Sequence, residues 1–268
     1  MLNISIVLYR PDVQRLKRLL DELTNIQSLR SIWLLDNSPE PSPELAQNIQ
    51  YPTSNIQYLF NNANLGYGRA HNIALRESIA EQTEFHLVIN DDIEVKAADI
   101  DALHNFMTAN PQVGQLMPRV VYPDGTTQYL AKRLPTPLDV FGRRFLPKAL
   151  MRKRNERYEL RQLVDQNKPL NVPYLSGCFM FLRTEAVSQA GLFDERYFMY
   201  PEDIDLTRTI HRDWLTLYYP AVTIVHNHAK GSYHNLRLLW VHIVNMCRYF
   251  NKWGWFHDPE RKIYNNEL

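Results

Sequence analysis

Three polar residues, Asn90, Asp91 and Asp92, follow directly after the apolar run 85–89. Carboxylates at the end of a strand leave the sheet together, and their oxygens suit Mg²⁺ or Mn²⁺, ions that usually share their coordination sphere with substrate phosphates. The alternative is structural, because an acidic pair at such a position also forms an Asx turn or caps a helix. Placement after a strand favours the metal interpretation only modestly.

A second group of acids begins a predicted helix after the sequence Phe-Met-Tyr-Pro. Glu202, Asp203 and Asp205 stand within four residues, where the helix macrodipole favours negative charge. Capping accounts for one acid but not for three, so a partly buried carboxylate here is a candidate general base. Helix capping and acid-base chemistry are equally good interpretations of this segment by itself.

A pair of histidines in His226-Asn227-His228 ends a late strand-like run. If the strand persists, the two imidazoles point in opposite directions, so that one of them faces a site. Imidazole is a frequent metal ligand, although a histidine pair is more often structural or exposed. Just beyond, Lys230 with Gly231 and Ser232 offers an ammonium group and backbone N–H groups to a phosphate.

The segment from Asn64 to Gly68 carries two glycines but matches neither common phosphate-binding motif. It has neither the spacing of the dinucleotide fingerprint nor the Gly-Lys-Ser/Thr of a P-loop. Ser176 also lacks the flanking glycines of a serine nucleophile elbow. Dinucleotide-dependent enzymes, P-loop NTPases and serine hydrolases of that type are therefore excluded.

Alternating strand and helix patterns over the first 95 residues would position these groups. We expect strands at 4–8, 32–35, 56–60 and 85–89 and helices at 11–23 and 69–79. Several of these strands end in polar, acidic or glycine-rich loops, and ligands of open α/β sheets bind beyond the carboxyl ends of strands. Further elements are expected at 97–109 (helix), 115–122 (extended), 173–183 (strand), 193–211 (loop and helix), 217–225 (strand) and 236–255 (helix).

Composition narrows the partners and the compartment. The 268 residues include 30 Lys and Arg against 29 Asp and Glu, so the net charge gives no global attraction to nucleic acid. We expect no nucleic-acid partner. A local basic segment, residues 132–161, holds ten Lys or Arg against three acids. The two cysteines, Cys178 and Cys247, argue against a disulfide scaffold and favour a reducing cytoplasm. No apolar run reaches the roughly 18 residues of a membrane span, so contact with a membrane would be peripheral.

The order of these groups resembles glycosyltransferase family 2, the GT-A nucleotide-sugar transferases, and more narrowly its rhamnosyltransferase-like branch. The resemblance covers nearly the whole chain and rests on seven segments in order: Ile6-Val7-Leu8-Tyr9, Leu35-Asp36-Asn37-Ser38, Asn64 to Gly68 with Ala70 and Asn72, Asn90-Asp91-Asp92, Leu175-Ser176-Gly177, Phe193 to Asp205, and His226-Asn227-His228. It implies an α/β fold, a GT-A Rossmann-like nucleotide-sugar-binding domain with a mixed central sheet. Its expected parts are a catalytic domain at 1–235, divided into a nucleotide-binding half (1–95) and an acceptor half (96–235), and a helical aromatic tail at 236–268.

The resemblance also implies roles for single residues. Asp92 would be the principal ligand of a divalent ion bridging the donor diphosphate, and His226 would complete that site. Asn90 stands where a stricter motif has Asp, so the choice between Asp91 and Asp92 stays open. Asp36 would recognise the nucleotide base. The whole expected donor-binding set is Tyr9, Asp36, Asn64, Gly66, Asn72, Asp91, Gly177 and Lys230.

Asp203 matches the catalytic base of inverting family members, and Glu202 would position the acceptor or orient Asp203. The implied reaction is a direct displacement, in which Asp203 takes the proton of the acceptor hydroxyl while Mg²⁺ or Mn²⁺ stabilises the departing nucleoside diphosphate.

The expected donor is dTDP-L-rhamnose and the expected acceptor is a saccharide, such as a polyprenyl-diphosphate-linked one, in bacterial surface polysaccharide synthesis such as that of O antigen. The basic segment and the aromatic tail would then contact the cytoplasmic face of the inner membrane. A solvated basic helix and a tail that packs on the domain or forms a dimer contact are the alternatives. Two other functions stay open: transfer of another hexose or of galactofuranose, and a non-catalytic GT-A module that binds a sugar nucleotide or glycan.

Overall fold

The computed structural model describes residues 1–42, 45, 55–227 and 236–268. Its strands are β1 (Leu2–Leu8), β2 (Leu29–Asp36), β3 (Ile56–Phe60), β4 (Phe85–Ile89), β5 (Ile93–Glu94), β6 (Val113–Val121), β7 (Ala131–Lys132), β8 (Leu170–Asn171), β9 (Tyr174–Leu175), β10 (Phe179–Arg183) and β11 (Leu215–His226). Its helices are α1 (Val13–Leu23), α3 (Tyr67–Ala80), α4 (Ala97–Ala109), the π-helical turn η1 (Leu138–Gly142), α5 (Arg143–Phe145), α6 (Lys148–Tyr158), α7 (Arg161–Val164), α8 (Thr184–Ala190), α9 (Glu202–Ile210), α10 (Leu236–Trp253) and α11 (Pro259–Asn266).

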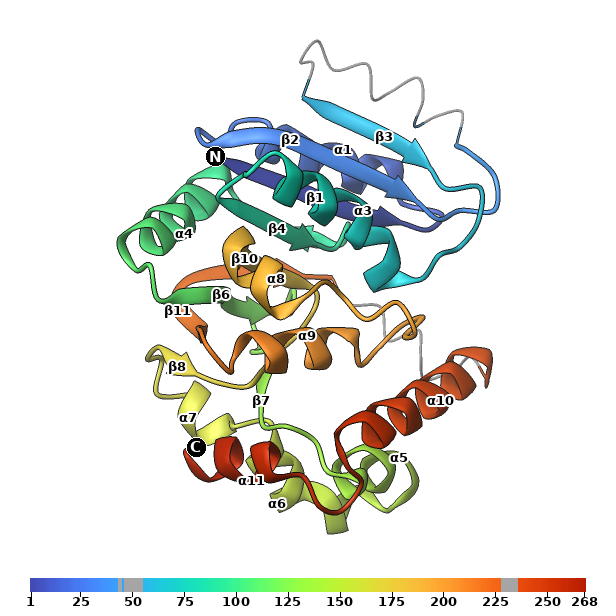
Figure 1. Cartoon of the computed structure of the whole chain (residues 1–268), viewed down its shortest axis with the longest axis vertical. Coiled ribbons are helices and arrows are strands. Elements are labelled where there is room, and N and C mark those ends of the chain that lie inside the picture. Colours follow the sequence, from blue (N-terminus) through green and yellow to red (C-terminus); the bar gives the residue numbers. More distant parts are fainter. Residues whose placement is uncertain (43–44, 46–54, 228–235) are drawn as a thin grey trace.

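The central sheet is mixed, with its described strands in the order β3-β2-β1-β4-β10-β6-β11-β5 and β8 paired with β11. Strands β3, β2, β1 and β4 are parallel, whereas β10 runs antiparallel between β4 and β6. Figure 1 shows this parallel part at the top and the later strands below it. The carboxyl ends of β1, β2 and β4 therefore meet the amino end of β10 at one edge of the sheet.

Helices cover both faces of this sheet. The apolar stripe of α1 buries Leu16, Leu19, Leu20 and Leu23 together with residues of α4 against the even-numbered side chains of β1, which include Ile4 and Ile6. On the other face, α3, α8 and α9 pack against β4 and β10. Because both faces of the sheet are covered, the strands are apolar almost throughout, and β4 is buried along its whole length.

The C-terminal helices are joined to α9 by buried charges. Arg208 of α9 is 1% exposed and donates to both carboxylate oxygens of Asp258, at 2.5 and 2.7 Å. Asp205 accepts from Lys252 at 2.7 Å and from the Trp253 indole at 2.6 Å. Asp205, one of the three acids at the start of α9, thus has a structural role. The predicted tail at 236–268 packs against α9, which lies within the predicted catalytic domain at 1–235. The boundary at residue 235 stays a prediction.

The predicted elements of the nucleotide-binding half are confirmed, with ends that move by up to three residues. The continuous strand expected at 173–183 is wrong: it is divided into β9 and β10 by Ser176, Gly177 and Cys178, whose backbone turns toward α9. Within the described part of the chain, no helix combines the length and the apolar character needed to cross a bilayer.

Candidate active site

Asp92 and His226 form a pair at the edge where β4 and β11 end. The Asp92 Oδ1 atom lies 3.2 Å from His226 Nε2. Asn227 donates its backbone N–H to the Asp92 carbonyl oxygen at 2.9 Å, and the backbones of β5 and β11 pair at Ile93 and His226. Residues 134 positions apart are therefore held together by main-chain contacts as well as by their side chains.

The His226 ring is oriented from behind by Gln128. Gln128 Nε2 donates to the His226 carbonyl oxygen at 2.8 Å, and its Oε1 lies 2.9 Å from Nδ1 of the ring. An Nδ1–H donated to Gln128 leaves Nε2 directed at Asp92. Burial disfavours the imidazolium form, but the neighbouring Asp92 carboxylate and Cys178 sulfur outweigh burial and raise the pKa of His226 to about 10.

Once the imidazolium has released its Nε2 proton, that nitrogen and the Asp92 carboxylate oxygen 3.2 Å from it are a donor set that suits Mn²⁺ or Mg²⁺. The described residues contain no cluster of three or more His, Cys, Asp or Glu side chains that would enclose an ion completely. The pair therefore fits an ion that takes its remaining ligands from a diphosphate, which is how Mg²⁺ is commonly bound.

Asp91 faces away from His226, toward α1. Arg15 donates from Nε to the Asp91 carbonyl oxygen at 3.2 Å, and its Nη2 lies 3.6 Å from the carboxylate. Burial raises the pKa of Asp91 in spite of the lowering effect of Arg15. This geometry favours Asp92 over Asp91 as the metal ligand and gives Arg15 the task of holding the acidic loop on α1.

A chain of hydrogen bonds joins Asp203 to this loop. Asp203 Oδ2 accepts the backbone N–H of Gly177 at 2.9 Å, and Oδ1 accepts that of Ile204 at 2.8 Å. The Gly177 carbonyl oxygen accepts the Tyr67 hydroxyl at 2.6 Å, and this hydroxyl lies 2.9 Å from Asn90 Oδ1. Asn90, beside the predicted acids at the end of β4, is thus connected to Asp203 at the start of α9.

A side chain at Gly177 would be crowded by Asp203. A Cβ atom on Gly177 would lie 3.1 Å from the Cβ of Asp203 and 3.5 Å from its Oδ2. The close approach lets the Gly177 backbone reach both Asp203 and Tyr67, which explains why the expected strand is broken here. Gly177 was predicted as a donor-binding residue, and the structure places it between the candidate base and Tyr67.

Glu202 and Asp203 are adjacent acids in different states. Burial, followed by the charge of Asp203, raises the pKa of Glu202 well above its usual value. Glu202 is 4% exposed, and its Oε2 has no hydrogen-bond partner among the described residues. Burial also raises the pKa of Asp203. The N–H groups of Gly177 and Ile204 and the charge of Lys132 oppose this effect, so the pKa reaches only about 6. At neutral pH Asp203 is therefore the ionised member of the pair.

Lys132 brings the basic segment to the site. Its ammonium nitrogen lies 5.2 Å from the ring centroid of Tyr174 and 6.0 Å from that of Tyr158. Burial, with the nearby charge of Arg143, lowers the pKa of Lys132 although Glu159 and Asp203 act in the opposite direction. Other basic residues of the segment are neutralised, because Arg143 and Arg161 each lie 2.6 Å from the Glu159 carboxylate.

The predicted nucleoside-binding residues gather at the ends of β2 and β3. Asp36 is fully buried, accepting from the Tyr58 hydroxyl at 2.6 Å and from the Ser38 N–H at 2.8 Å. Asn64 Oδ1 accepts the N–H of Gly66 at 3.0 Å, and Gly66 has a φ of 86°. A Cβ on Gly66 would overlap the carbonyl oxygen of Phe198, so glycine is needed for the loop to pack against the segment before α9.

The remaining predicted donor-binding residues divide into three cases. Asn72 is fully buried and exchanges hydrogen bonds with the backbone of Phe193 at 2.9 and 3.0 Å, so it fastens α3 to the segment leading to α9. Tyr9 is 54% exposed just after β1. Lys230, together with His228, lies outside the described residues.

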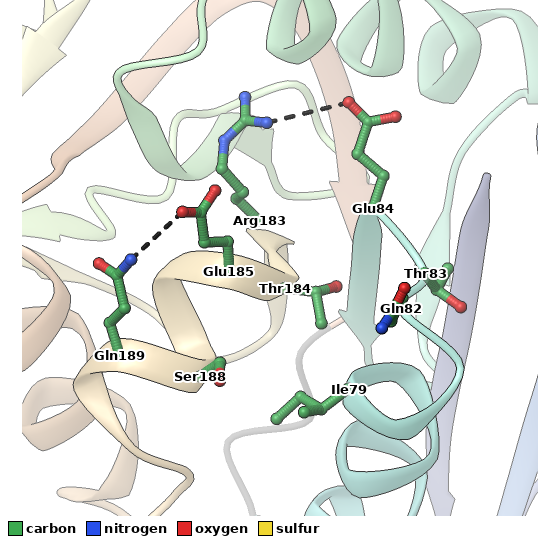
Figure 2. Close-up of a pocket in the computed structure, with 9 residues that line it drawn as sticks. All are labelled: Ile79, Gln82, Thr83, Glu84, Arg183, Thr184, Glu185, Ser188 and Gln189. Carbon is green, nitrogen blue, oxygen red and sulfur yellow. Dashed lines mark hydrogen bonds and ion pairs between the residues drawn. The ribbon is translucent and has the colours of Figure 1, made fainter.

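A cavity of about 440 Å³ occupies the opposite edge of the sheet, at the start of β4 and the end of β10 (Figure 2). It is lined in part by Glu84 and Arg183, whose charged groups lie 3.9 Å apart, and by Thr184. None of the predicted site residues lines it. The predicted site residues therefore lie apart from this cavity.

Comparison with known families identifies the family of this chain. Residues 5–191 match the sequence profile of glycosyl transferase family 2. The chain belongs to this family. It is therefore a glycosyltransferase, and the family inferred from the order of its motifs is confirmed.

Two named relatives of this glycosyltransferase cover most of its length. The N-acetylglucosaminyl-diphospho-decaprenol L-rhamnosyltransferase of Mycobacterium tuberculosis is 33% identical over 217 residues, 75% of this chain and 68% of that protein. The low-salt glycan biosynthesis hexosyltransferase Agl10 of Haloferax volcanii is 27% identical over 230 residues, 84% of this chain and 67% of that protein. The predicted similarity to rhamnosyltransferases is confirmed by the first of these.

Solved structures agree on the fold. GalNAc-T7 with UDP, GalNAc and Mn²⁺ superposes with a TM-score of 0.68 at 15% identity, covering 94% of this chain and 48% of that one. The mannosyltransferase PcManGT of Pyrobaculum calidifontis, in complex with GDP-Man and Mn²⁺, gives 0.58 at 16% identity, covering 92% and 64%. At such identities the similarity shows the fold alone, which is the GT-A fold predicted for this glycosyltransferase.

Sequence reasoning did not assign a role to three residues of the site: Tyr67, Gln128 and Lys132. Tyr67 lies inside the Asn64 to Gly68 motif, so its position was a signal that had no chemistry attached to it. Gln128 and Lys132 stand in a region without a motif, and Gln128 reaches His226 across 98 residues. No local pattern in the sequence could have identified either contact.

Proposed function

We propose that this chain is an inverting, metal-dependent rhamnosyltransferase that moves L-rhamnose from dTDP-L-rhamnose to a saccharide carried on a lipid diphosphate. The named function of the 33% identical relative, which acts on N-acetylglucosaminyl-diphospho-decaprenol, supports this sugar and this class of acceptor. The proposed setting is the assembly of a bacterial surface polysaccharide at the cytoplasmic face of the inner membrane.

Asp203 is the proposed general base. Each of its oxygens accepts one backbone N–H, which leaves one lone pair on each oxygen for the proton of the acceptor hydroxyl. Because its pKa is about 6, it is ionised at neutral pH while remaining basic enough to accept a proton. Neutral Glu202 beside it adds no second charge.

Asp92 and His226 would hold a divalent cation, which would neutralise the charge that develops on the departing nucleoside diphosphate. Gln128 keeps the imidazole turned toward Asp92, and Arg15 keeps the loop between β4 and β5 on α1. Asp36, Asn64 and Gly66 would bind the nucleoside at the ends of β2 and β3, so that the sugar would lie between the nucleoside and Asp203.

The single observation that carries this proposal is the hydrogen-bonded path from Asp203 through Gly177 and Tyr67 to Asn90, next to the Asp92 and His226 pair. It joins a candidate base to a candidate metal-diphosphate site. Displacement at an anomeric carbon needs both groups close to one substrate.

The test is transfer by the purified chain to a short-chain lipid-diphosphate N-acetylglucosamine, followed by mass spectrometry of the product. dTDP-L-rhamnose, UDP-galactofuranose and other hexose donors are compared, each with Mn²⁺, with Mg²⁺ and with EDTA. We expect a rhamnose-sized mass gain that requires the ion, with inverted anomeric configuration by NMR.

A mass gain from another donor would replace rhamnose by that sugar, an outcome to which the hexosyltransferase relative gives some weight. Donor binding without transfer or hydrolysis for any donor and acceptor tried would contradict the enzyme and leave a sugar-nucleotide-binding module.

A further inference from the structure

The first half of α10 is mostly apolar and only partly covered. Residues 236–244 read LRLLWVHIV, and among the described residues none of them is buried. Leu236 is 83% exposed and Trp240 is 67% exposed. The second half of the same helix does pack on the domain, because Met246, Tyr249 and Phe250 are buried in the C-terminal aromatic cluster. Figure 1 shows the start of α10 at the outer side of the molecule.

The neighbouring segment η1 to α6 exposes a second group of large apolar side chains. Phe145 is 62% exposed and Leu150 is 75% exposed, and Leu138 and Leu146 are each exposed by more than two fifths. Isolated exposed apolar residues are common on proteins, but four within thirteen residues are not a scattered pattern. Arg143, Arg144 and Lys148 stand among them in the sequence.

These two groups belong to one side of the molecule. Phe141 of η1 lies 6.2 Å from Phe250 of α10 and 6.3 Å from Trp255, measured between ring centroids. Arg144 is close enough to His242, in the first half of α10, to lower its pKa after burial has done so. Figure 1 shows α5 lying directly beside α10.

The same side carries cations without acidic partners. Arg152, Lys153 and Arg157 of α6 are exposed, and the ion pairs formed by the described residues include none of the three. By contrast, Arg143, Arg154 and Arg161 are paired with Glu159 or Asp139 at 2.6 Å. The pairing therefore divides the basic segment into cations that hold the fold together and cations that face outward.

We propose that this apolar-basic surface docks onto an anionic lipid bilayer; it consists of Leu138, Phe145, Leu146, Leu150, Leu236 and Trp240 with Arg152, Lys153 and Arg157. Apolar side chains enter the boundary between head groups and acyl chains, and the cations meet lipid phosphates. A second copy of the chain fits less well, because two surfaces of the same positive charge would be brought together. The consequence for catalysis rests on the proposed function: docking would bring the site to a lipid-linked acceptor.

The test is co-sedimentation with phosphatidylcholine vesicles, with and without phosphatidylglycerol, in the absence of donor and acceptor. Each cation near an anionic surface strengthens binding about fivefold, so the variant Arg152→Gln, Lys153→Gln, Arg157→Gln should bind on the order of 100-fold more weakly. Phe145→Ser with Trp240→Ser should weaken binding as well, and high salt should weaken binding of the unaltered protein.

Two control variants remove exposed cations or an exposed apolar side chain from parts of the surface outside the proposed docking surface. Arg18→Gln, Lys96→Gln, Lys168→Gln removes three exposed cations, and Leu59→Ser removes an exposed apolar side chain from β3, at the far end of the molecule in Figure 1. Both should bind vesicles as the unaltered protein does. Thermal melting checks that every variant is folded.

Several outcomes would overturn the docking surface. The unaltered protein could stay in the supernatant with anionic vesicles, or the surface variants could bind as well as the controls. A dimer in sedimentation equilibrium that the Phe145 and Trp240 substitutions abolish, without vesicle binding, would assign the surface to a second copy instead. Because this assay contains no substrate, its result is separate from the outcome of the transfer assay.

Discussion

Replacing Asp203 by Asn tests the base and its environment together. An amide cannot accept the proton of the acceptor hydroxyl, so transfer should fall about 10²- to 10⁴-fold while donor binding is retained. In the unaltered protein, kcat/KM should decline about tenfold for each pH unit below the Asp203 pKa of about 6.

The same substitution should change the pH dependence of stability. Burial raises the pKa of Asp203 from 3.8 to about 6, so keeping it ionised in the folded protein costs about 3 kcal/mol. Below the pKa of the unfolded state, Asp203 is protonated in both the folded and the unfolded protein, so this cost is absent. The cost grows as pH rises from the unfolded-state pKa through the higher folded-state pKa, because the buried carboxyl group must then ionise. Asp203→Asn avoids the charge but leaves one backbone N–H less well paired, a loss of about 1–3 kcal/mol at all pH values.

The free energy of unfolding of the variant relative to the unaltered protein should therefore rise by about 3 kcal/mol between about pH 4 and about pH 7. Urea denaturation at both pH values measures this difference. Asp213→Asn, an exposed acid just beyond α9, is the matched control and should show no such change. A relative stability that does not vary with pH, or near-normal transfer by the variant, would refute the assignment of Asp203 as a buried base.

Three further predictions concern the surroundings of this base. Lys132→Met removes a positive charge, so it should raise the pKa of Asp203 and move the acid limb of the kcat/KM pH profile to higher pH. Lys132→Arg keeps the charge and should leave this limb in place. If neither variant moved the limb, Lys132 would not belong to the site. Asp92→Ala should abolish the Mn²⁺-dependent part of donor affinity in calorimetry, and an unchanged affinity would reduce Asp92 to a turn residue. Gly66→Ala should lower Tm far more than Gly125→Ala, because both have positive φ but only at Gly66 would the Cβ overlap a backbone carbonyl; equal losses would contradict that account.

Much of the fold could be predicted because its signals are local. The apolar runs before Asp36 and Asn90 and the leucine stripe of α1 have the periods of strand and helix within a few residues. The helix expected at 97–109 has the same bounds in the structure. The site could be predicted in part for the same reason, since each acidic or histidine motif follows or begins such an element.

Contacts between distant segments could not be predicted in this way. The 173–183 segment reads as one strand, and only its packing against Asp203 and Tyr67 shows why it breaks at Gly177. The antiparallel position of β10 between β4 and β6 likewise depends on pairings between residues 65 to 98 positions apart, which no short period encodes.

The sequence by itself therefore determined the family, the elements of the parallel half, and the residue types that stand at their ends, because these are properties of composition, order and short-range period. Only the tertiary structure decided which partner each acid of a group contacts. Asp92 lies against His226 whereas Asp91 lies against Arg15, and Asp203 reaches Gly177 whereas Asp205 binds Lys252. Adjacent residues of one type differ in burial and partners, and those are set by which distant segments fold against them.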